Sequence, residues 1–291
     1  MKFSRGLLCL FLSLTFIGLT GILHVRGAEK SGETYGNGKI TITLATGTPG
    51  SLGLVKSLAG PFCAKNNCRI RWINMGSGES LEALKAGQAD IIMVHAPDAE
   101  KKAVNAGWAV NRQLIGGNEF FILGPASDPA GIRGLSSVTE AYKKIAEAGA
   151  LFFTRNDNSG THKKEMMIWE MAGIKPSDPW YVATNTFMEP TLKRADDEKG
   201  YFMTDSSTYY AIKQGVKNLE ILLRGDLVLV NVYHIMSVPE EKRKGDISRL
   251  LTGFIGFVIS DEGQRIIREF GIPEYGVPLY MDAKQAGSAA K

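Results

Sequence analysis

The stretch ADIIMVHAPDAEKKAVNAG, residues 89–107, decides the fold. Its first half, ADIIMVHA, is a mainly apolar run, which is typical of a strand buried on both faces of a parallel sheet. Pro97 and Asp98 then provide the signals of a helix start, and a helix of ordinary length fits the residues up to Gly107. A buried strand followed directly by a helix is the repeating unit of an α/β sheet.

Several further segments repeat this unit along the chain. Apolar runs predict the strands, and amphipathic stretches that follow Gly- or Ser-rich turns predict the helices between them. The predicted strands cover residues 39–45, 69–75, 118–125, 150–155 and 227–238, and the predicted helices cover residues 80–87, 136–149, 161–173, 241–259 and 261–270. This alternation predicts a mostly parallel sheet with right-handed crossovers, in which ligands bind at the carboxyl ends of the strands.

The length of 291 residues favours two lobes. The chain has two candidate crossing points between them, near residues 122–125 and near residues 223–230. Two crossings predict a discontinuous first lobe and a second lobe inserted into it, with a ligand cleft between the two. The predicted bounds are residues 39–122 and 227–280 for the first lobe and residues 123–226 for the second.

Both ends of the chain differ in composition from the middle. Residues 1–27 begin with two positive charges, continue with an uncharged apolar run over residues 7–23 and end on small residues. This is the layout of a secretory signal peptide that is cut after Gly27, and it predicts a periplasmic or other extracytoplasmic location. Retention of the segment as a membrane anchor is the alternative. The end of the chain, AKQAGSAAK (283–291), is small and polar, and we predict a disordered tail over residues 281–291.

The charge of the chain does not indicate a nucleic-acid partner. The sequence has 34 basic and 30 acidic residues. The predicted signal peptide contains three of the basic residues and none of the acidic ones, so the mature chain is almost neutral. Binding of nucleic acid needs a clustered basic surface, which this composition does not predict.

Cys63 and Cys68, in PFCAKNNCRI, are the two cysteines that follow the predicted signal peptide. In an oxidising compartment, a pair this close predicts a disulfide that joins a helix end to the next strand. A C-x4-C half-site for a metal is the alternative, but the sequence has no second pair to complete it. We therefore expect no metal and no cofactor.

Three strand–turn–helix junctions share a composition that suits an anion: ATGTPGS (45–51), MGSGES (75–80) and RNDNSGTH (155–162). The unpaired N–H groups and partial positive charge of a helix N-terminus attract an anion, and nearby hydroxyls add donors. One such turn is more typical of simple helix capping, but three together favour a shared oxyanion site. The candidate residues are Gly47, Gly76, Gly78, Gly160, Thr46, Thr48, Ser77, Ser159, Thr161 and Arg155. Capping does not explain the arginine, which is suited to a charged, two-pronged contact with an oxyanion.

Five segments together resemble the tungstate-binding proteins of tungstate ABC importers: MVHAPDAE, ILGPASDPAGI, TRNDNSGTHKKE, WEMAGI and MTDSSTYYAIK. The resemblance spans roughly residues 39–275. It implies a two-lobed type 2 periplasmic binding protein, with a mostly parallel sheet flanked by helices in each lobe and the ligand in the cleft between them. It also implies a receptor, not an enzyme, that captures tungstate or its close mimic molybdate and delivers it to a membrane permease. We expect this receptor to be a monomer.

The resemblance maps the family's ligand turns onto residues 46–51 and onto the SGT turn that follows Arg155. Together with the composition of the turns, this predicts ligands from both lobes. They are Thr46, Thr48 and Ser77 from the first lobe and Arg155, Ser159 and Thr161 from the second, with Gly47, Gly78 and Gly160 beside them and Thr204 and Ser206 as weaker candidates. The first turn departs from the family pattern of three threonines and a serine, because it reads Thr46, Gly47, Thr48, Pro49. The departure bears on affinity and on the choice of oxyanion.

Phosphate is the alternative ligand, because an arginine with a D-x-SGT turn also resembles the phosphate-binding proteins of the same fold. Near pH 7 phosphate carries a proton and benefits from a carboxylate acceptor, whereas tungstate and molybdate carry none and need only donors. Asp157 is the carboxylate of this turn. We expect it to face away from the ligand and to cap the helix.

A secreted hydrolase is the alternative from another functional class. Ser159 lies three residues before His162, and Asp90 and His95 lie at another strand end, so a nucleophile and a base can be imagined. The sequence has no G-x-S-x-G elbow, and we expect no catalytic residues. We expect His162 to be a first-turn helix residue and His95 to be a structural histidine. A binding module that signals instead of transporting remains a further alternative.

Overall fold

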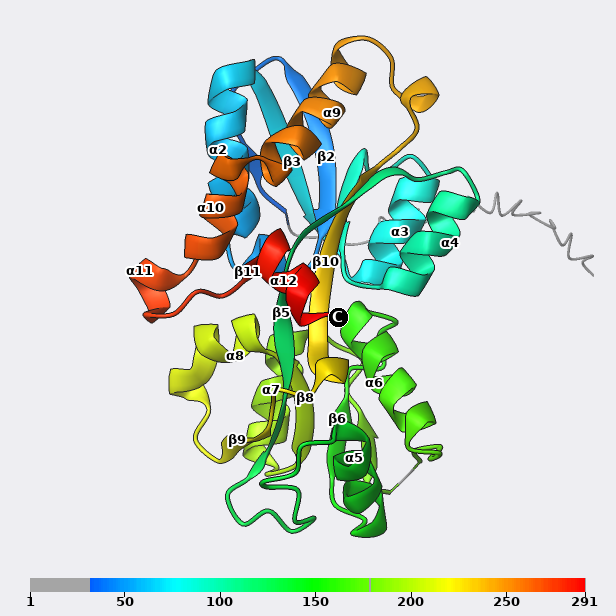
Figure 1. Ribbon diagram of the computed structural model, residues 1–291, viewed down its shortest axis with the longest axis vertical. Coiled ribbons are helices and arrows are strands. Elements are labelled where there is room, and N and C mark those ends of the chain that lie inside the picture. The colour runs from blue at the N-terminus through cyan, green and yellow to red at the C-terminus, as the bar shows by residue number, and fades with distance from the viewer. Residues whose placement is uncertain (1–31, 178, 291) are drawn as a thin grey trace, which may run out of the picture.

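The computed structural model describes residues 32–177 and 179–290 (Figure 1). The signal peptide predicted for residues 1–27 lies outside the described residues. Within the described ranges, no helix has both the length and the apolar character needed to cross a membrane. The strands form one path in the order β1-β3-β2-β4-β10-β5-β8-β6-β7, with β9 and β11 paired to β5.

The first lobe is built on parallel strands. Strand β2 (Ile40–Thr46) pairs in parallel with β3 (Cys68–Asn74) and β4 (Ile91–Val94), and β1 (Thr34–Tyr35) adds an antiparallel edge. All four residues of β4 are buried, as a strand covered on both faces requires. The helices of this lobe are α1 (Thr48–Ser51), α2 (Leu54–Asn66), α3 (Ser77–Lys85), α4 (Pro97–Asn105), α9 (Asp246–Ile259), α10 (Asp261–Glu269) and α11 (Ile272–Tyr275), with a 3-10 turn at Glu240–Lys242. Figure 1 shows α2, α9 and α10 packed together on one side of this lobe.

The second lobe repeats the plan on a smaller scale. Strand β6 (Phe152–Thr154) pairs in parallel with β7 (Tyr181–Ala183) and β8 (Tyr201–Asp205). The helices are α5 (Val138–Glu147), α6 (Gly160–Met171), α7 (Met188–Asp197) and α8 (Ser206–Ile212), and 3-10 turns lie at Lys213–Gly215 and Leu227–Leu229. An aromatic core fills the lobe, in which the ring of Trp169 contacts those of Tyr142 and Phe152 at centroid distances of 4.3 and 5.1 Å.

Two long antiparallel strands join the lobes. Strand β5 (Val110–Pro125) pairs with β10 (Val230–Ser237) and, further along, with β8 and with β9 (Leu219–Leu223). Figure 1 shows β5 and β10 side by side between the lobes. Because β10 also pairs with β4, it places the end of β4 next to the crossing. The ends of β2 and β4 lie side by side in the first lobe, and they face the end of β6 in the second lobe.

The prediction of a disordered tail over residues 281–291 is wrong for residues 281–290, which the structure describes. Residues Met281–Asp282 form strand β11 against β5, and Ala283–Ala289 form helix α12. Asp282 begins this helix with a reciprocal capping box, and its carboxylate also accepts a hydrogen bond from Arg268 at 2.7 Å. Ala286 is fully buried in the same helix. The small residues of this helix allow it to pack closely against β5.

The disulfide predicted for Cys63 and Cys68 is also absent. Both cysteines are buried free thiols, and the Cys68 Sγ donates a hydrogen bond to the Cys63 Sγ at 3.3 Å. A disulfide bond needs about 2.05 Å. Burial raises the pKa of the Cys63 thiol to about 12, so the neutral thiol is the stable form at this position.

Candidate functional site

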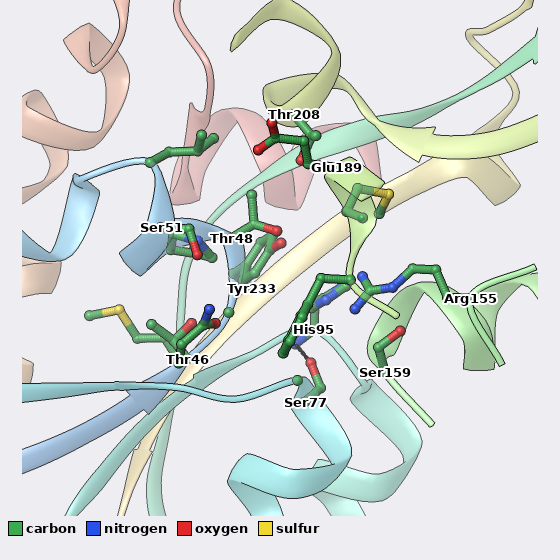
Figure 2. A pocket seen from close by; sticks show the side chains of 18 of the residues that line it. Thr46, Thr48, Ser51, Ser77, His95, Arg155, Ser159, Glu189, Thr208 and Tyr233 are labelled. Carbon is green, nitrogen blue, oxygen red and sulfur yellow. Dashed lines mark hydrogen bonds between the residues drawn. The ribbon is translucent and has the colours of Figure 1, made fainter. Parts of the chain in front are cut away.

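A cavity of about 210 Å³ lies between the two lobes, and strand ends and helix starts form its wall (Figure 2). Its lining residues are Thr46, Gly47, Thr48, Pro49, Ser51, Leu52, Asn74, Gly76, Ser77, Met93, His95, Arg155, Ser159, Phe187, Met188, Glu189, Pro190, Thr208, Ile212 and Tyr233. All three turns that the sequence singled out reach this cavity. It is small, and most of its polar groups are hydroxyls.

The turn after β2 forms one side of the cavity. Thr46 is the last residue of β2, Gly47 is the N-cap of α1, and Thr48 is the first residue of that helix. The main chain of Thr46 is held by Trp72, whose Nε1 donates to the Thr46 carbonyl at 2.9 Å. The Thr46 Oγ1 is buried and has no hydrogen-bond partner among the described residues. A buried hydroxyl of this kind is costly unless a ligand completes it.

The second turn contributes Ser77, the first residue of α3. Its Oγ accepts a hydrogen bond from the backbone N–H of His95 at 3.2 Å, so its own O–H is free to donate (Figure 2). This bond also joins the end of β4 to the start of α3. Asn74, which ends β3, lines the cavity as well, although no motif in the sequence points to it.

The third turn supplies Arg155 and Ser159. Figure 2 shows the Arg155 guanidinium beside His95 and Ser159. Arg155 is 5% exposed, and its Nε has no partner in the described part of the chain. Its Nη2 forms an ion pair with the Asp157 Oδ2 at 2.5 Å. The guanidinium is thus held from one side by a carboxylate while a buried N–H is still unused.

Asp157 does not line the cavity, as expected, but it does not cap α6, and the prediction of a capping role is wrong. The N-cap is Ser159, whose Oγ accepts from the His162 N–H at 3.2 Å. The Asp157 Oδ1 instead accepts from the Ser159 N–H at 3.1 Å, in a turn of two residues. The carboxylate therefore faces away from the cavity, as expected, and fixes both Arg155 and Ser159.

Five predicted site residues lie outside the cavity wall. They are Gly78, Gly160, Thr161, Thr204 and Ser206. The Thr161 hydroxyl is buried without a partner in the described ranges, and the Thr204 hydroxyl donates to the Asp205 carbonyl at 3.3 Å. A helix start directs successive side chains to different sides, so neighbours of a ligand residue in sequence need not share its direction. Thr208, which was not among the predicted site residues, lines the cavity from α8.

The cavity contains one buried cation and no buried carboxylate within the described lining. Arg155 is the cation, and Glu189 is the lining carboxylate, with a half-exposed side chain that pairs with Lys193 at 2.6 Å. Burial lowers the pKa of His95 to about 4, so this ring is neutral at pH 7. The site therefore offers donors and one positive charge to a small anion.

The contacts of His162 do not support a nucleophile and base at this turn. The Asn158 N–H donates to the His162 Nδ1 at 3.1 Å, while the backbone N–H of His162 donates to Ser159. The imidazole thus makes a local turn contact and does not act on the Ser159 hydroxyl. At the other imagined pair, Asp90 bonds to Thr43 and Arg243 instead of His95. The described residues also hold no group of three or more metal-ligating side chains.

Glu165 is a buried acid in the helix that begins at the site. It is fully buried, and its Oε1 accepts a hydrogen bond from the Tyr181 hydroxyl at 2.5 Å. Its Oε2 has no partner among the described residues. Burial raises the pKa of this carboxyl from 4.5 to about 8, so the folded protein keeps it protonated at pH 7.

Glu165→Gln is therefore expected to make the protein more stable at pH 7. Above pH 4.5 the unfolded chain loses this proton and the folded chain keeps it, so stability falls by up to about 1.4 kcal/mol per pH unit until pH 8. Glutamine removes this slope. Urea unfolding of both proteins at pH 5, 6, 7 and 8 measures it, with Glu170→Gln on the exposed side of the same helix as the control. If the free energies of unfolding of the wild type and Glu165→Gln change in parallel between pH 5 and pH 8, Glu165 is not a buried, protonated acid.

Comparisons with known proteins give one family and several similar proteins, all of which are binding proteins or transporter components. Residues 27–262 match the family described as a PBP superfamily domain. A tungstate-binding protein, TupA, of Peptoclostridium acidaminophilum is 32% identical over 267 residues, which cover 91% of this chain and 93% of that protein. The crystal structure of the tungstate ABC transporter from Geobacter sulfurreducens is similar at 38% identity and a TM-score of 0.72, over 80% of this chain and all of that one. The tungstate-binding protein TupA from Desulfovibrio alaskensis is similar at 35% identity and a TM-score of 0.70, over 84% and 99% of the two chains.

Proposed function

Because the chain belongs to the periplasmic binding protein superfamily and, within it, to the tungstate-binding proteins of ABC importers, we propose that it captures a tetrahedral oxyanion. The ligand is tungstate, with molybdate as its close mimic. The receptor works in the extracytoplasmic space and delivers this ligand to a membrane permease. We further propose that residues 1–27 direct export, that the protein acts as a monomer, and that it carries out no reaction on its ligand.

One observation supports this proposal above the others: buried donors without partners come from both lobes. Thr46 Oγ1 lies on the first lobe and Arg155 Nε on the second. Each atom is buried without a partner among the described residues, and each would gain a hydrogen bond to a ligand oxygen. A tetrahedral dianion supplies oxygens in several directions at once and therefore suits donors on opposite walls.

Binding then favours closure of the lobes. A ligand that bridges Thr46, Thr48 and Ser77 on one lobe to Arg155 and Ser159 on the other gains all of its bonds only when the lobes are together. The closed receptor is the form that presents the bound oxyanion to a permease.

The absence of a buried carboxylate among the described lining residues favours an unprotonated oxyanion over phosphate. Asp157 is turned toward Arg155, and Glu189 is half-exposed at the cavity and paired with Lys193. A proton on phosphate would therefore meet donors instead of an acceptor.

Titration of the purified protein with tungstate, molybdate, sulfate and phosphate tests the proposal. Calorimetry at pH 7.5 is expected to give tungstate and molybdate affinities that exceed that of phosphate by on the order of 10- to 100-fold, the cost of one mismatched charged hydrogen bond. Sulfate is expected to bind more weakly than tungstate because it is smaller than the ring of donors. Tight phosphate binding without tungstate binding would overturn the choice of ligand.

A further inference from the structure

The two lobes meet at glycines. A Cβ placed on Gly160, the first residue of α6, would lie 2.5 Å from the Cε1 and 2.6 Å from the Nε2 of His95 in the other lobe. A Cβ on Gly78 would lie 2.7 Å from the carbonyl oxygen of Asn158. Neither glycine has a positive φ, so the backbone conformation does not require glycine. The close approach of the opposite lobe does.

The ring that Gly160 meets is held firmly. His95 stacks on Tyr233 of β10, with a centroid distance of 4.6 Å and an interplanar angle of 26°. Its Nδ1 lies 2.8 Å from the Oδ1 of Asn231, two residues earlier on the same strand. The backbone N–H of His95 is bound to Ser77. Stacking, a side-chain bond and a backbone bond therefore restrain this residue from three directions.

A chain of side-chain hydrogen bonds runs from His95 through both hinge strands into the second lobe. The Asn231 Nδ2 donates to the Asn118 Oδ1 at 2.7 Å, and the Asn118 Nδ2 donates to the Asp205 Oδ1 at 3.3 Å. Asn231 lies on β10, Asn118 on β5, and Asp205 is the N-cap of α8. All three are almost fully buried.

The direction of this chain is fixed at its Asp205 end. The Asp205 Oδ1 already accepts from the backbone N–H of Thr208 at 2.9 Å, so it is an acceptor. Asn118 must then donate to it and offer its own oxygen to Asn231, which must in turn offer its oxygen to His95. The His95 Nδ1 is therefore the donor. Because burial keeps this ring neutral at pH 7, its Nε2 on the side of Gly160 carries no proton.

We propose that His95 is a positioning residue for oxyanion capture. The Asn231–Asn118–Asp205 chain holds its ring in place, and Gly160 packs against this ring when the lobes close. The inference rests on the proposed function. Seating of Gly160 fixes the start of α6, and with it the neighbouring Ser159 and Arg155, at the cavity. Because the chain passes through both hinge strands, the position of the ring is tied to the relative orientation of the lobes.

Gly160→Ala, His95→Ala and the double variant test the contact in a mutant cycle. Gly160→Ala is expected to weaken binding of tungstate about tenfold or more, because a clash that lowers the closed population lowers the apparent affinity in proportion. Alanine is at least as good as glycine in a helix, so the fold should not suffer. In the double variant the clash is gone, and its affinity should match that of His95→Ala alone. Gly256→Ala, on α9 with open space around it, is the control and should bind like the wild type.

The proposed contact would be overturned by either of two results. One is a double variant whose loss of affinity equals the sum of the two single losses, and the other is an unchanged affinity of Gly160→Ala. If the wild type binds a different oxyanion, the same cycle is run with that oxyanion. The choice of tungstate can therefore be wrong while the contact between Gly160 and His95 is still tested.

The tautomer of His95 gives a second test that needs no ligand and no variant. Long-range ¹H–¹⁵N spectra of ¹⁵N-histidine protein distinguish the two neutral tautomers. His95 is expected to carry its proton on Nδ1. His162 accepts from Asn158 at Nδ1 and should carry its proton on Nε2, so it serves as the internal contrast. A proton on the Nε2 of His95 would overturn the hydrogen-bond chain.

Discussion

Arg155→Ala is expected to weaken tungstate binding by about 1.5–3 kcal/mol, roughly 10- to 150-fold, which is the range of one charged hydrogen bond. The guanidinium is the buried cation of the described cavity wall, and its Nε is unpaired. Removal also leaves Asp157 without its ion-pair partner at 2.5 Å, which adds repulsion toward a dianion. Calorimetric titration of the variant with tungstate measures the loss.

Two further variants separate the contributions of this arginine. Arg155→Lys keeps the charge and removes the planar pair of donors, and we expect an affinity between those of the wild type and the alanine variant. Arg133→Ala removes an exposed arginine of the same lobe that pairs with Glu220 at 2.9 Å, and it should leave affinity unchanged. Equal affinities for Arg155→Ala and the wild type would remove Arg155 from the site.

Asp196→Ala is expected to lower the free energy of unfolding by on the order of 2–4 kcal/mol. Asp196 lies in α7 and is buried. Its Oδ1 accepts from three consecutive backbone N–H groups that lead into β9 (Leu219–Leu223). They belong to Lys217, Asn218 and Leu219, at 3.1, 2.8 and 3.0 Å. Alanine leaves these donors without an acceptor, and the Leu219 N–H is buried.

Urea unfolding followed by circular dichroism measures this loss, in buffer without oxyanion because a ligand would stabilise the folded state. Asp197→Ala removes the next carboxylate along the chain, which is exposed, and is expected to change stability by less than about 0.5 kcal/mol. Similar unfolding curves for the two variants would show that the three backbone bonds do not stabilise the second lobe.

Local patterns were enough for much of the fold. The apolar run before Pro97 predicted β4 and α4, and the SGT turn predicted the start of α6, because strand burial and helix starts depend on residues close in sequence. The tail was predicted incorrectly for the complementary reason. Its helix depends on Arg268 and on burial of Ala286 beside β5, neither of which a composition of small residues reveals.

The sequence by itself determined the α/β class, the three hydroxyl-rich turns and the arginine at one of them, since each is a property of a few neighbouring residues. Only the tertiary structure decided which side chains of those turns face the cavity. It turned Asp157 toward Arg155, left Thr161 outside the lining and added Asn74 and Thr208 to it. It also joined His95 to Asp205 through Asn231 and Asn118. Those contacts arise because β10 lies between β4 and β5 in the sheet, and strand order is a property of the whole chain.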